Sequence, residues 1–299
     1  MAPPDVLVLG GRPEGWHGAR LREALERLGL TVARADFQDL GFVLGGGGRP
    51  RLSGLDELPH STLVRSIPAG TFEQVTLRLG MLHALEALGV VVVNHARAIE
   101  RCVDKAMTSF LLTARGLPTP PTWALQSPEV ARRLCATEAA AGHRLVLKPL
   151  FGAQGRGLRL LAGPDDLPEP DELGGVFYLQ RFVPGTGAGW CDLRVFVVAG
   201  RPVAGMRRRG ATWVTNIGRG GLAEPIHLSG RLGQLAVAAA AAVGAEHAGV
   251  DLIEDRNGDL QILEVNSMPA WQGLQAVTTE DIARHLATHL ARRIGRPLR

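Results

Sequence analysis

Two polar residues end an otherwise apolar run late in the sequence, Glu264 and Asn266 in the segment 262–269 (ILEVNSMP). Residues two positions apart on a β-strand project to the same face, so this carboxylate and this carboxamide are predicted to point the same way. Oxygen donors gathered on one face of a buried strand suit a divalent cation. The neighbouring elements have to bring further donors to that face.

The preceding run supplies a third donor, Asp251. Residues 249–266 read as two β-like runs around Asn257-Gly258, the residue pair that best supports a two-residue type I′ hairpin turn. Counting back from that turn along both strands places Asp251 directly opposite Glu264. Directly opposed side chains lie about 4.5–5.5 Å apart, where two like charges are destabilising.

Two carboxylates and an amide oxygen on one face become favourable when a divalent cation lies among them, and such hard donors suit Mg²⁺ or Mn²⁺. We therefore predict a metal site formed by Asp251, Glu264 and Asn266. The alternative is a solvated hairpin whose charges face water. Apolar residues in both runs favour a mostly buried pair instead: Leu252, Ile253, Ile262, Leu263 and Val265.

The chain contains only two lysines, Lys105 and Lys148, among its 33 basic side chains. A compact ammonium can reach a phosphate as a point charge where a planar guanidinium would be too large. Two lysines retained in so arginine-rich a sequence are predicted to bind phosphate. Surface lysines kept by chance are the alternative.

Lys148 ends the apolar run 144–148 and precedes a glycine-rich segment, PLFGAQGRGLRLL. Gly152, Gly155 and Gly157 separate two β-like runs, so we expect a strand, a glycine loop and a second strand. Glycines let successive backbone N–H groups approach and cradle phosphate oxygens. No Gly-Lys-Ser/Thr follows, which excludes a Walker loop, and an ordinary hairpin with a glycine turn is the alternative.

Lys105 follows Asp104 at the start of a predicted helix that runs to about Arg115 and ends before Gly116. An ammonium in the first helical turn lies near the positive end of the helix dipole, which does little for the fold but suits the binding of an anion. Further on, residues 177–189 (FYLQRFVPGTGAG) are expected to form a strand that ends in a flexible hinge.

Composition limits the classes of protein. A chain of 299 residues is long enough for two or three compact units. It has no long uncharged apolar run and no basic-then-apolar leader, so we expect a soluble cytoplasmic protein without membrane contact. Three scattered cysteines fit a reducing compartment. The net charge of +4 is spread along the chain apart from Arg207–Arg209, which leaves a weak case for binding polyanions.

Taken in chain order, these motifs resemble those of the ATP-grasp ligases, and within them the RimK-like amino-acid ligases. The resemblance covers nearly the whole chain. It rests on the segments VDKAMTS, VLKPLFGAQGRG, LQRFV, DLRVFVVAGRPVAGMRRR, WVTNIGRGG, GVDLIED and LEVNSMP. Residues 64–94 followed by AIERCVDK look most like the tetrahydromethanopterin:L-glutamate ligases.

The resemblance implies an α/β (α+β) architecture, the ATP-grasp fold. A Rossmann-like pre-ATP-grasp domain would span residues 1–100, and two α+β lobes, 101–183 and 184–299, would clamp ATP. It also implies a reaction. A substrate carboxylate attacks the γ-phosphate of ATP to give an acyl phosphate, and an amine then displaces phosphate to form an amide.

The resemblance further implies roles for single residues. The nucleotide would be bound by Lys105, Lys148, Gly152, Gln154, Gly155, Gly157, Gln180, Arg181, Phe182 and Val183, with Gln180 and the backbone of residues 181–183 in contact with adenine. Two Mg²⁺ (or Mn²⁺) ions would be bound by Asp251, Glu264 and Asn266. Arg194, Arg208 and Asn216 would act in catalysis by positioning the acyl phosphate or the substrate carboxylate, and Arg65, Asp192 and Ser267 would contact substrate.

Two departures from the family pattern stand out. Members usually carry an acidic residue that contacts the ribose soon after the hinge, and residues 183–191 (VPGTGAGWC) offer none. Val214 stands where a basic residue is common, so we expect an altered amino-acid pocket.

The N-terminal third is expected to serve the substrate. DVLVLG reads as a buried strand, and the next helix carries an apolar stripe of Leu21, Ala24, Leu25 and Leu28. Thr71 and Gln74 form a predicted capping box. Arg65 is a candidate for a substrate carboxylate, with an ordinary surface arginine as the alternative. Trp16 and His17, at a strand-to-helix turn, are expected to be structural.

The sequence therefore predicts an ATP-dependent carboxylate–amine ligase that acts on small molecules. Its expected reaction adds glutamate, or a similar amino acid, to a carboxylate of a small coenzyme such as a tetrahydromethanopterin-type pterin. A RimK-like or LysX-like ligase acting on a peptide or carrier-protein carboxylate stays open. So do an ATP-grasp carboxylase or kinase and a basic nucleic-acid-binding protein based on Arg207–Arg209. No nucleic-acid or membrane partner is expected, and a homo-oligomer is compatible with the sequence.

Overall fold

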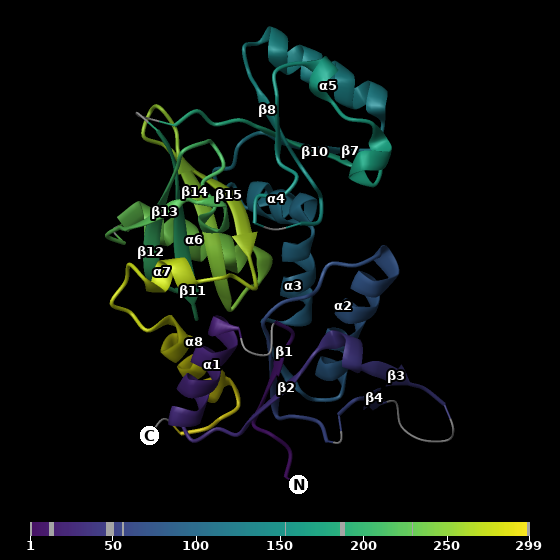
Figure 1. Cartoon of the computed structure of the whole chain (residues 1–299), viewed down its shortest axis with the longest axis vertical. Helices are drawn as coiled ribbons and strands as arrows, with labels where there is room; N and C mark the ends of the chain where they lie inside the picture. Colours follow the sequence, from purple (N-terminus) through teal and green to yellow (C-terminus); the bar gives the residue numbers. More distant parts are fainter. Residues whose placement is uncertain are drawn as a thin grey trace.

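Three larger β-sheets follow one another along the described part of the chain, each in its own body. The computed structural model of the protein describes residues 2–11, 15–45, 51–55, 57–152, 154–185, 189–228 and 230–297. The central body lies at the top of Figure 1, the C-terminal body below it, and the N-terminal body at the bottom. Within these ranges no helix is long and apolar enough to cross a membrane.

The N-terminal body is a parallel sheet in the order β2-β1-β5-β6. Its strands are β1 (Val6–Leu9), β2 (Val32–Ala35), β5 (Ser61–Val64) and β6 (Val91–Val93), and its helices are α1 (Trp16–Arg27), α2 (Phe72–Ala87) and α3 (Ala96–Val103). A short hairpin joins β3 (Gly41–Val43) and β4 (Arg51–Ser53), and η1 (Phe37–Asp39) precedes it. All four residues of β1 are buried, as expected for a parallel strand covered on both faces. The predicted capping box at Thr71 and Gln74 is confirmed.

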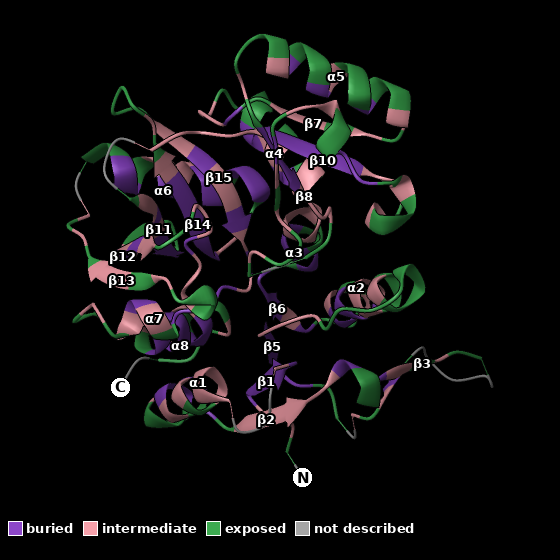
Figure 2. Ribbon diagram, turned by 45° about the horizontal axis from the view of Figure 1, so that its top comes forward, coloured by how far each residue is buried: buried purple, intermediate pink, exposed green. Residues whose placement is uncertain are grey.

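The central body is an antiparallel sheet in the order β7-β10-β8-β9. Its elements are β7 (Thr122–Leu125), α5 (Pro128–Ala140), β8 (Leu145–Lys148), β9 (Arg159–Leu161), η2 (Pro164–Asp166), η3 (Pro170–Leu173) and β10 (Phe177–Arg181). Helix α5 buries Ala131 and Cys135 against the sheet and exposes its outer side, shown in green in Figure 2. The predicted strand, glycine loop and strand are present as β8, the loop and β9.

The C-terminal body is an antiparallel sheet in the order β13-β12-β11-β14-β15. Its strands are β11 (Trp190–Val198), β12 (Arg201–Gly210), β13 (Leu222–Pro225), β14 (His247–Glu254) and β15 (Leu260–Asn266). Its helices are η4 (Ile217–Arg219), α6 (Gly230–Val243), α7 (Gln272–Gln275) and α8 (Ile282–Arg293). One face of the sheet packs on α6, and α7 and α8 cover part of the other face.

Helices at the body boundaries join the three bodies. Helix α8, yellow in Figure 1, packs beside α1, so a single apolar core runs from the N-terminal sheet into the C-terminal body. Helix α4 (Lys105–Ala114) packs against α6 and β15 and also contacts β7 of the central sheet. The boundaries at residues 100 and 183 stay a prediction, but each sheet falls within one of the three predicted segments.

The hairpin that carries the predicted metal residues differs from expectation at its turn. Its last pair is Glu254 with Leu260, so the connection is longer than the predicted two residues. The Asp255 carboxylate accepts backbone N–H groups of Asn257 and Asp259, which stabilises the wider turn. The prediction of a type I′ Asn-Gly turn was therefore wrong.

A β-bulge compensates for the longer turn. The register shifts between Asp251 and Leu252, and beyond this shift Asp251 lies opposite Glu264, as predicted. The bulge also places both Ile262 and Val265 in the core beneath α6, although their spacing would put them on opposite faces of a regular strand. Glu264 is thereby turned to the opposite face.

Candidate active site

A row of charged side chains crosses one face of the C-terminal sheet. On β11 the side chains of Leu193 and Val195 enter the core with α6, so Asp192 and Arg194 project to the other face. Register then places Arg194 opposite Asp251 on β14, and Asp251 opposite Glu264 on β15. Four of the predicted site residues thus share one face because of strand pairing alone.

Arginines hold Asp251 firmly. Arg194 donates two hydrogen bonds of 2.7 Å to its two carboxylate oxygens, and Arg208 lies 3.0 Å from Oδ2. Arg208 also donates two bonds, of 2.7 and 2.5 Å, to Asp192 opposite it on β12 and β11. Burial alone would raise the pKa of Asp251, but Arg194 and Arg208 together keep that pKa below its ordinary value.

The other two predicted metal donors are free to bind a cation. Glu264 has no ion pair or hydrogen bond within the described part of the chain. Asn266 donates weakly to the Gly249 carbonyl at 3.4 Å, which leaves its Oδ1 available. Two carboxylates and one amide oxygen fit a hard divalent cation such as Mg²⁺. The described residues hold no cluster of three His, Cys, Asp or Glu side chains, and Asn266 supplies the third donor of this set.

Both lysines lie within the electrostatic influence of Glu264. Burial lowers the pKa of Lys148 to about 8, and the positive charge of Lys105 adds to this effect, whereas Glu264 opposes it. The pKa of Lys105 is likewise lowered by burial and raised by Glu264. Lys105 is the first residue of α4 and Lys148 is the last residue of β8. Two separate elements therefore bring their ammonium groups towards β15, the strand that carries Glu264.

The side chain of Gln180 is occupied by Lys148. Its Oε1 accepts from the Lys148 ammonium at 2.7 Å, and its Nε2 donates to Thr122 Oγ1 at 3.1 Å. Gln180 is only 2% exposed, so both polar atoms of its amide are engaged inside the protein. The nearby Arg181 points to Glu138, with bonds of 2.8 and 2.9 Å.

Lys105 organises the glycine loop. Its ammonium donates to the carbonyl oxygens of Gly152 at 2.8 Å and Leu150 at 3.3 Å. The predicted capping role of Asp104 is confirmed, because its carboxylate accepts from the N–H groups of Ala106 and Met107. The helix start and the loop are thus tied together before any nucleotide binds.

The glycine loop also approaches the C-terminal body. Gly155 has φ +66°, and a Cβ there would lie 2.4 Å from Asn216 Oδ1 and 2.9 Å from Val214. A Cβ at Gly157, which has φ +71°, would lie 2.8 Å from Pro149. Only glycine fits both positions without displacement. Gln154, beside Gly155, also has a positive φ, of 63°.

The segment after β10 forms an aromatic cluster. Phe182 makes edge contacts with Trp190 and Trp213, at ring-centroid distances of 5.8 and 6.1 Å, and the Arg144 guanidinium lies 4.8 Å from its centroid. Val183 follows directly. Residues 186–188, part of the segment 183–191 that lacks the expected ribose-contacting acid, lie outside the described residues.

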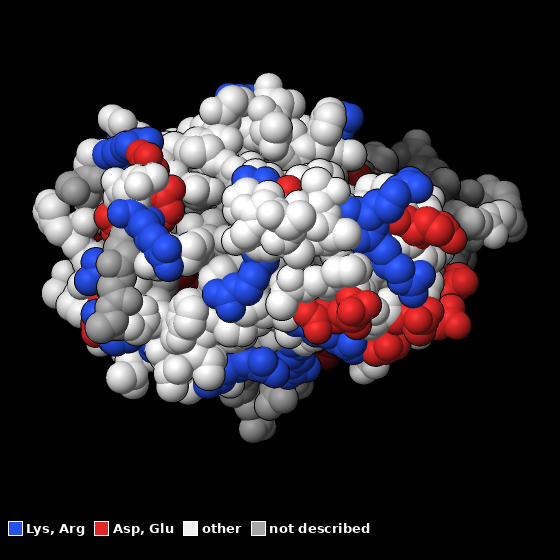
Figure 3. Space-filling model, turned by 90° about the horizontal axis from the view of Figure 1, so that it is seen from above, with Lys and Arg blue, Asp and Glu red and all other residues white. Residues whose placement is uncertain are grey.

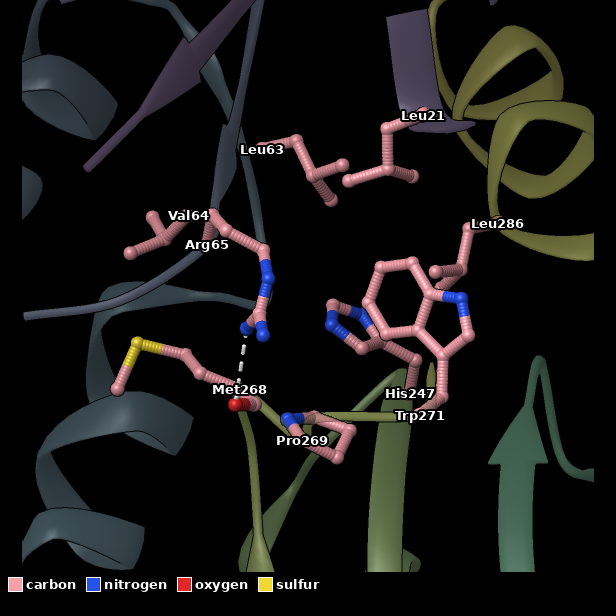
Figure 4. A pocket seen from close by; sticks show the side chains of 9 residues that line it. All are labelled: Leu21, Leu63, Val64, Arg65, His247, Met268, Pro269, Trp271 and Leu286. Atoms are coloured by element: carbon pink, nitrogen blue, oxygen red, sulfur yellow. Dashed lines mark hydrogen bonds between the residues drawn. The ribbon is translucent and has the colours of Figure 1, made fainter. Parts of the chain in front are cut away.

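Two further candidates for substrate contact, Arg65 and Ser267, have surroundings of their own. Arg65 donates to the Met268 carbonyl at 3.1 Å and stacks 5.2 Å from the Trp271 ring centroid, as Figure 4 shows. The cavity beside it measures about 10 Å³, room for about one water molecule. Ser267 is 2% exposed, and its hydroxyl has no partner within the described ranges. Substrate roles for both residues stay predictions, and Arg65 is not the surface arginine of the alternative.

Residues 102–290 match the RimK-like ATP-grasp domain. The chain therefore belongs to the RimK-like ATP-grasp ligases, ATP-using enzymes that form carbon–nitrogen bonds. It is 35% identical over 229 residues to the tetrahydromethanopterin:alpha-L-glutamate ligase of Methanococcus maripaludis, which covers 75% of this chain and 76% of that protein. It is 32% identical over 291 residues to a probable alpha-L-glutamate ligase of Saccharophagus degradans, which covers 93% and 92% of the two chains.

Solved structures show the same fold. The ATP-grasp ligase PsnB complexed with minimal precursor superposes with a TM-score of 0.74 at 23% identity, over 98% of this chain and all of that one. D-cycloserine synthetase DcsG gives a TM-score of 0.71 at 20% identity, over 97% and 99%. The predicted ATP-grasp fold and the resemblance to RimK-like ligases are confirmed.

Several residues that shape the site gave no local signal in the sequence. Thr122 holds Gln180, Glu138 holds Arg181, and Asn94 contacts the end of the metal strand. Their partners lie 43 to 173 residues away in the chain. Only the three-dimensional arrangement reveals them.

Proposed function

We propose that this ligase adds glutamate, or a closely similar amino acid, to a carboxylate of a small acceptor through an acyl phosphate. The proposal rests on one observation: Lys105 and Lys148 lie close enough to Glu264 to interact with its charge, and Glu264 lies on the same sheet face as the charged residues of β11 and β14. Relatives named as glutamate ligases support the amino acid, and their identities of 32–35% leave the acceptor open.

The chemistry follows from the charges of this site. A carboxylate oxygen of the acceptor attacks the γ-phosphorus of ATP, the β–γ bond breaks, and ADP departs. The amine of the amino acid then attacks the acyl carbon, phosphate leaves with the electron pair of the C–O bond, and the nitrogen loses a proton. Charge builds on oxygens in both steps, so cationic donors positioned in advance are the main requirement.

Individual residues take distinct parts in this proposal. Lys148 and Lys105 bind the phosphates, and the glycine loop covers them. Arg194 and Arg208 lie at the cleft face of the sheet, where a guanidinium can stabilise the acyl phosphate. Asp251, Glu264 and Asn266 would hold Mg²⁺ or Mn²⁺, which when bound neutralises phosphate charge.

The acceptor is the least determined part of the reaction. A tetrahydromethanopterin-type pterin is the first candidate, because the relatives from methanogens carry that name. A peptide or carrier-protein carboxylate is the second candidate, because PsnB, which shares the fold, was solved with a precursor. The absence of a basic residue at Val214 supports a pocket that differs from that of other members.

A phosphate-release screen tests the proposal. The enzyme is incubated with ATP, Mg²⁺, one amino acid and one acceptor, with glutamate and reduced pterins first, and products are identified by mass. We expect release that needs both an amine and a carboxylate. Release that proceeds without any amine would instead indicate a kinase or carboxylase.

A nucleic-acid-binding role finds no support in the charge distribution. Arg208 is buried and paired with Asp192, and Arg209 pairs with Glu224 at 2.9 Å, so the run Arg207–Arg209 is largely neutralised. On the face shown in Figure 3 basic and acidic side chains are interspersed rather than gathered into one basic surface.

A further inference from the structure

Polar side chains of the N-terminal body form hydrogen bonds with the segment that follows β15, residues 267–271. Asn94 donates to the carbonyl of Ser267 at 2.7 Å, and Arg65 donates to that of Met268 at 3.1 Å. His17 Nε2 accepts the N–H of Trp271 at 3.0 Å. Burial lowers the pKa of His17 to about 4, so the ring is neutral and able to accept.

Asn94 makes the most contacts of these three side chains. It is fully buried, at 0% exposure, directly after β6. Its Nδ2 donates to the carbonyls of Ser267 and His247 at 2.7 and 2.8 Å. Its Oδ1 accepts the N–H groups of Glu246 and His247 at 2.7 and 2.9 Å. One amide therefore uses both of its donors and its acceptor on backbone groups of the C-terminal body.

These contacts extend the hydrogen bonding of the β14–β15 hairpin beyond its last backbone pair. The last backbone pair between β14 and β15 is Gly249 with Asn266, and His247 and Ser267 lie just beyond it. The Asn94 side chain hydrogen-bonds to both of those residues. It therefore connects the two chain segments at a point next to Asn266 where they are no longer paired through their backbones. The Asn266 side chain itself has only the weak 3.4 Å bond to Gly249.

We propose that Asn94 is a positioning residue for the metal site: it fixes the end of β15 so that the Asn266 oxygen faces the same cation as Asp251 and Glu264. This inference rests on the metal site proposed above. It also links the N-terminal body to the ATP cleft, because Asn94 precedes α3, which leads into α4 and Lys105.

The test compares metal affinity with nucleotide affinity. Asn94→Asp keeps the acceptor for Glu246 and His247 but loses both donors to the carbonyls. Mn²⁺ binding is followed by electron paramagnetic resonance with saturating ADP, and ADP binding is measured separately without metal. Loss of a supporting partner typically weakens metal binding by about 10–100-fold. We expect a weakening of about 10-fold or more for Mn²⁺ and less than about 3-fold for ADP.

Ser61→Ala is the matched control. Ser61 is also fully buried in the N-terminal sheet and donates to the Asp5 carbonyl at 2.8 Å, and within the described ranges its side chain makes no hydrogen bond to the C-terminal body. It should lower thermal stability and leave Mn²⁺ affinity unchanged. If Asn94→Asp does not fold, Asn94→Ser carries the same expectation. Equal losses of Mn²⁺ and ADP affinity, or Mn²⁺ affinity within 3-fold of wild type, would overturn the inference.

A further variant separates this inference from the site beneath it. Glu264→Gln removes a proposed metal ligand directly. If Glu264→Gln leaves Mn²⁺ binding intact, the metal site itself is wrong. If Glu264→Gln abolishes Mn²⁺ binding and Asn94→Asp does not affect it, only the positioning role of Asn94 fails.

Discussion

Arg194 and Asp251 face each other across β11 and β14 and share two hydrogen bonds of 2.7 Å. A carboxylate proposed to bind a cation is therefore already neutralised by a guanidinium. Removing Asp251 would leave Arg194 without its carboxylate partner in a buried setting and Arg208 with Asp192 alone, and loss of one partner of a buried pair typically costs about 3–5 kcal/mol. Loss of activity in an Asp251 variant would thus report on folding as much as on metal binding, and Glu264 offers the cleaner test.

Glu264→Gln should separate stability from function. Glu264 has no ion pair within the described ranges, so its neutral isostere should fold with a Tm close to that of wild type. In wild type, ADP with Mg²⁺ at 100 times its Kd should raise the free energy of unfolding by about 2.7 kcal/mol. We expect a rise in Tm of roughly 5 °C or more in wild type and a clearly smaller rise in Glu264→Gln, measured by differential scanning fluorimetry. An equal rise in both proteins would remove Glu264 from the metal site.

Lys148→Met should weaken ATP binding without unfolding the chain. A hydrogen bond to a charged group contributes about 1.5–3 kcal/mol, so the Kd measured by calorimetry should rise by one to two powers of ten. The fold should persist, because within the described residues Lys148 forms no ion pair with a carboxylate and its side chain bonds to the Gln180 amide alone. The arginine at position 159 on β9 pairs with Glu172 at the surface, and Arg159→Met is a control that should bind ATP normally. A normal Kd for Lys148→Met would contradict its role.

ATP affinity should fall at alkaline pH. Burial lowers the pKa of Lys148 to about 8 in the free protein, and a phosphate-binding lysine has to be protonated. The Kd of a non-hydrolysable ATP analogue should be constant from about pH 6.5 to 7.5 and then rise by up to about tenfold per unit above pH 8. In Lys148→Arg the guanidinium stays charged, so the alkaline rise should be reduced. A Kd independent of pH up to 9.5 in wild type would count against this assignment.

Gly155→Ala should impair nucleotide binding more than an ordinary glycine replacement. Its Cβ would lie 2.4 Å from Asn216 Oδ1, so the loop could not keep its place against the C-terminal body. Gly142 is a matched control, because it also has a positive φ, of 79°, but nothing within 4 Å of its Cβ position. Both variants incur the backbone strain of about 1 kcal/mol. Only Gly155→Ala should raise the KM for ATP in the phosphate-release assay, and equal KM values would argue against a role of the glycine loop in binding ATP.

Local patterns determined much of what the sequence could predict. Asp104 caps its helix, Thr71 forms its capping box, and β8 and β9 flank the glycine loop, since each feature depends on residues close in the chain. The pairing of Asp251 with Glu264 was also predicted, although two deviations cancelled to produce it. The turn is wider than predicted, and the bulge restores the register.

Contacts between residues far apart in the chain could not be predicted from the sequence. The partners of Asn94 lie 152 to 173 residues away, and nothing near Asn94 in the chain indicates them. The contact of Gln180 with adenine stays a prediction, and only the pairing of β10 with β8 reveals that its side chain accepts a hydrogen bond from Lys148. Arg65 reads as a ligand-binding residue in isolation, whereas its guanidinium contacts Met268 and Trp271 at the junction of two bodies.

The most direct test of the proposed reaction follows an oxygen atom. An acceptor that supports phosphate release is prepared with ¹⁸O in its carboxylate, and the inorganic phosphate formed in the presence of glutamate is analysed by mass spectrometry. An acyl phosphate requires that one carboxylate oxygen leave with the phosphate, so we predict one ¹⁸O atom in each phosphate released. Phosphate without ¹⁸O, formed together with the amide product, would contradict the mechanism.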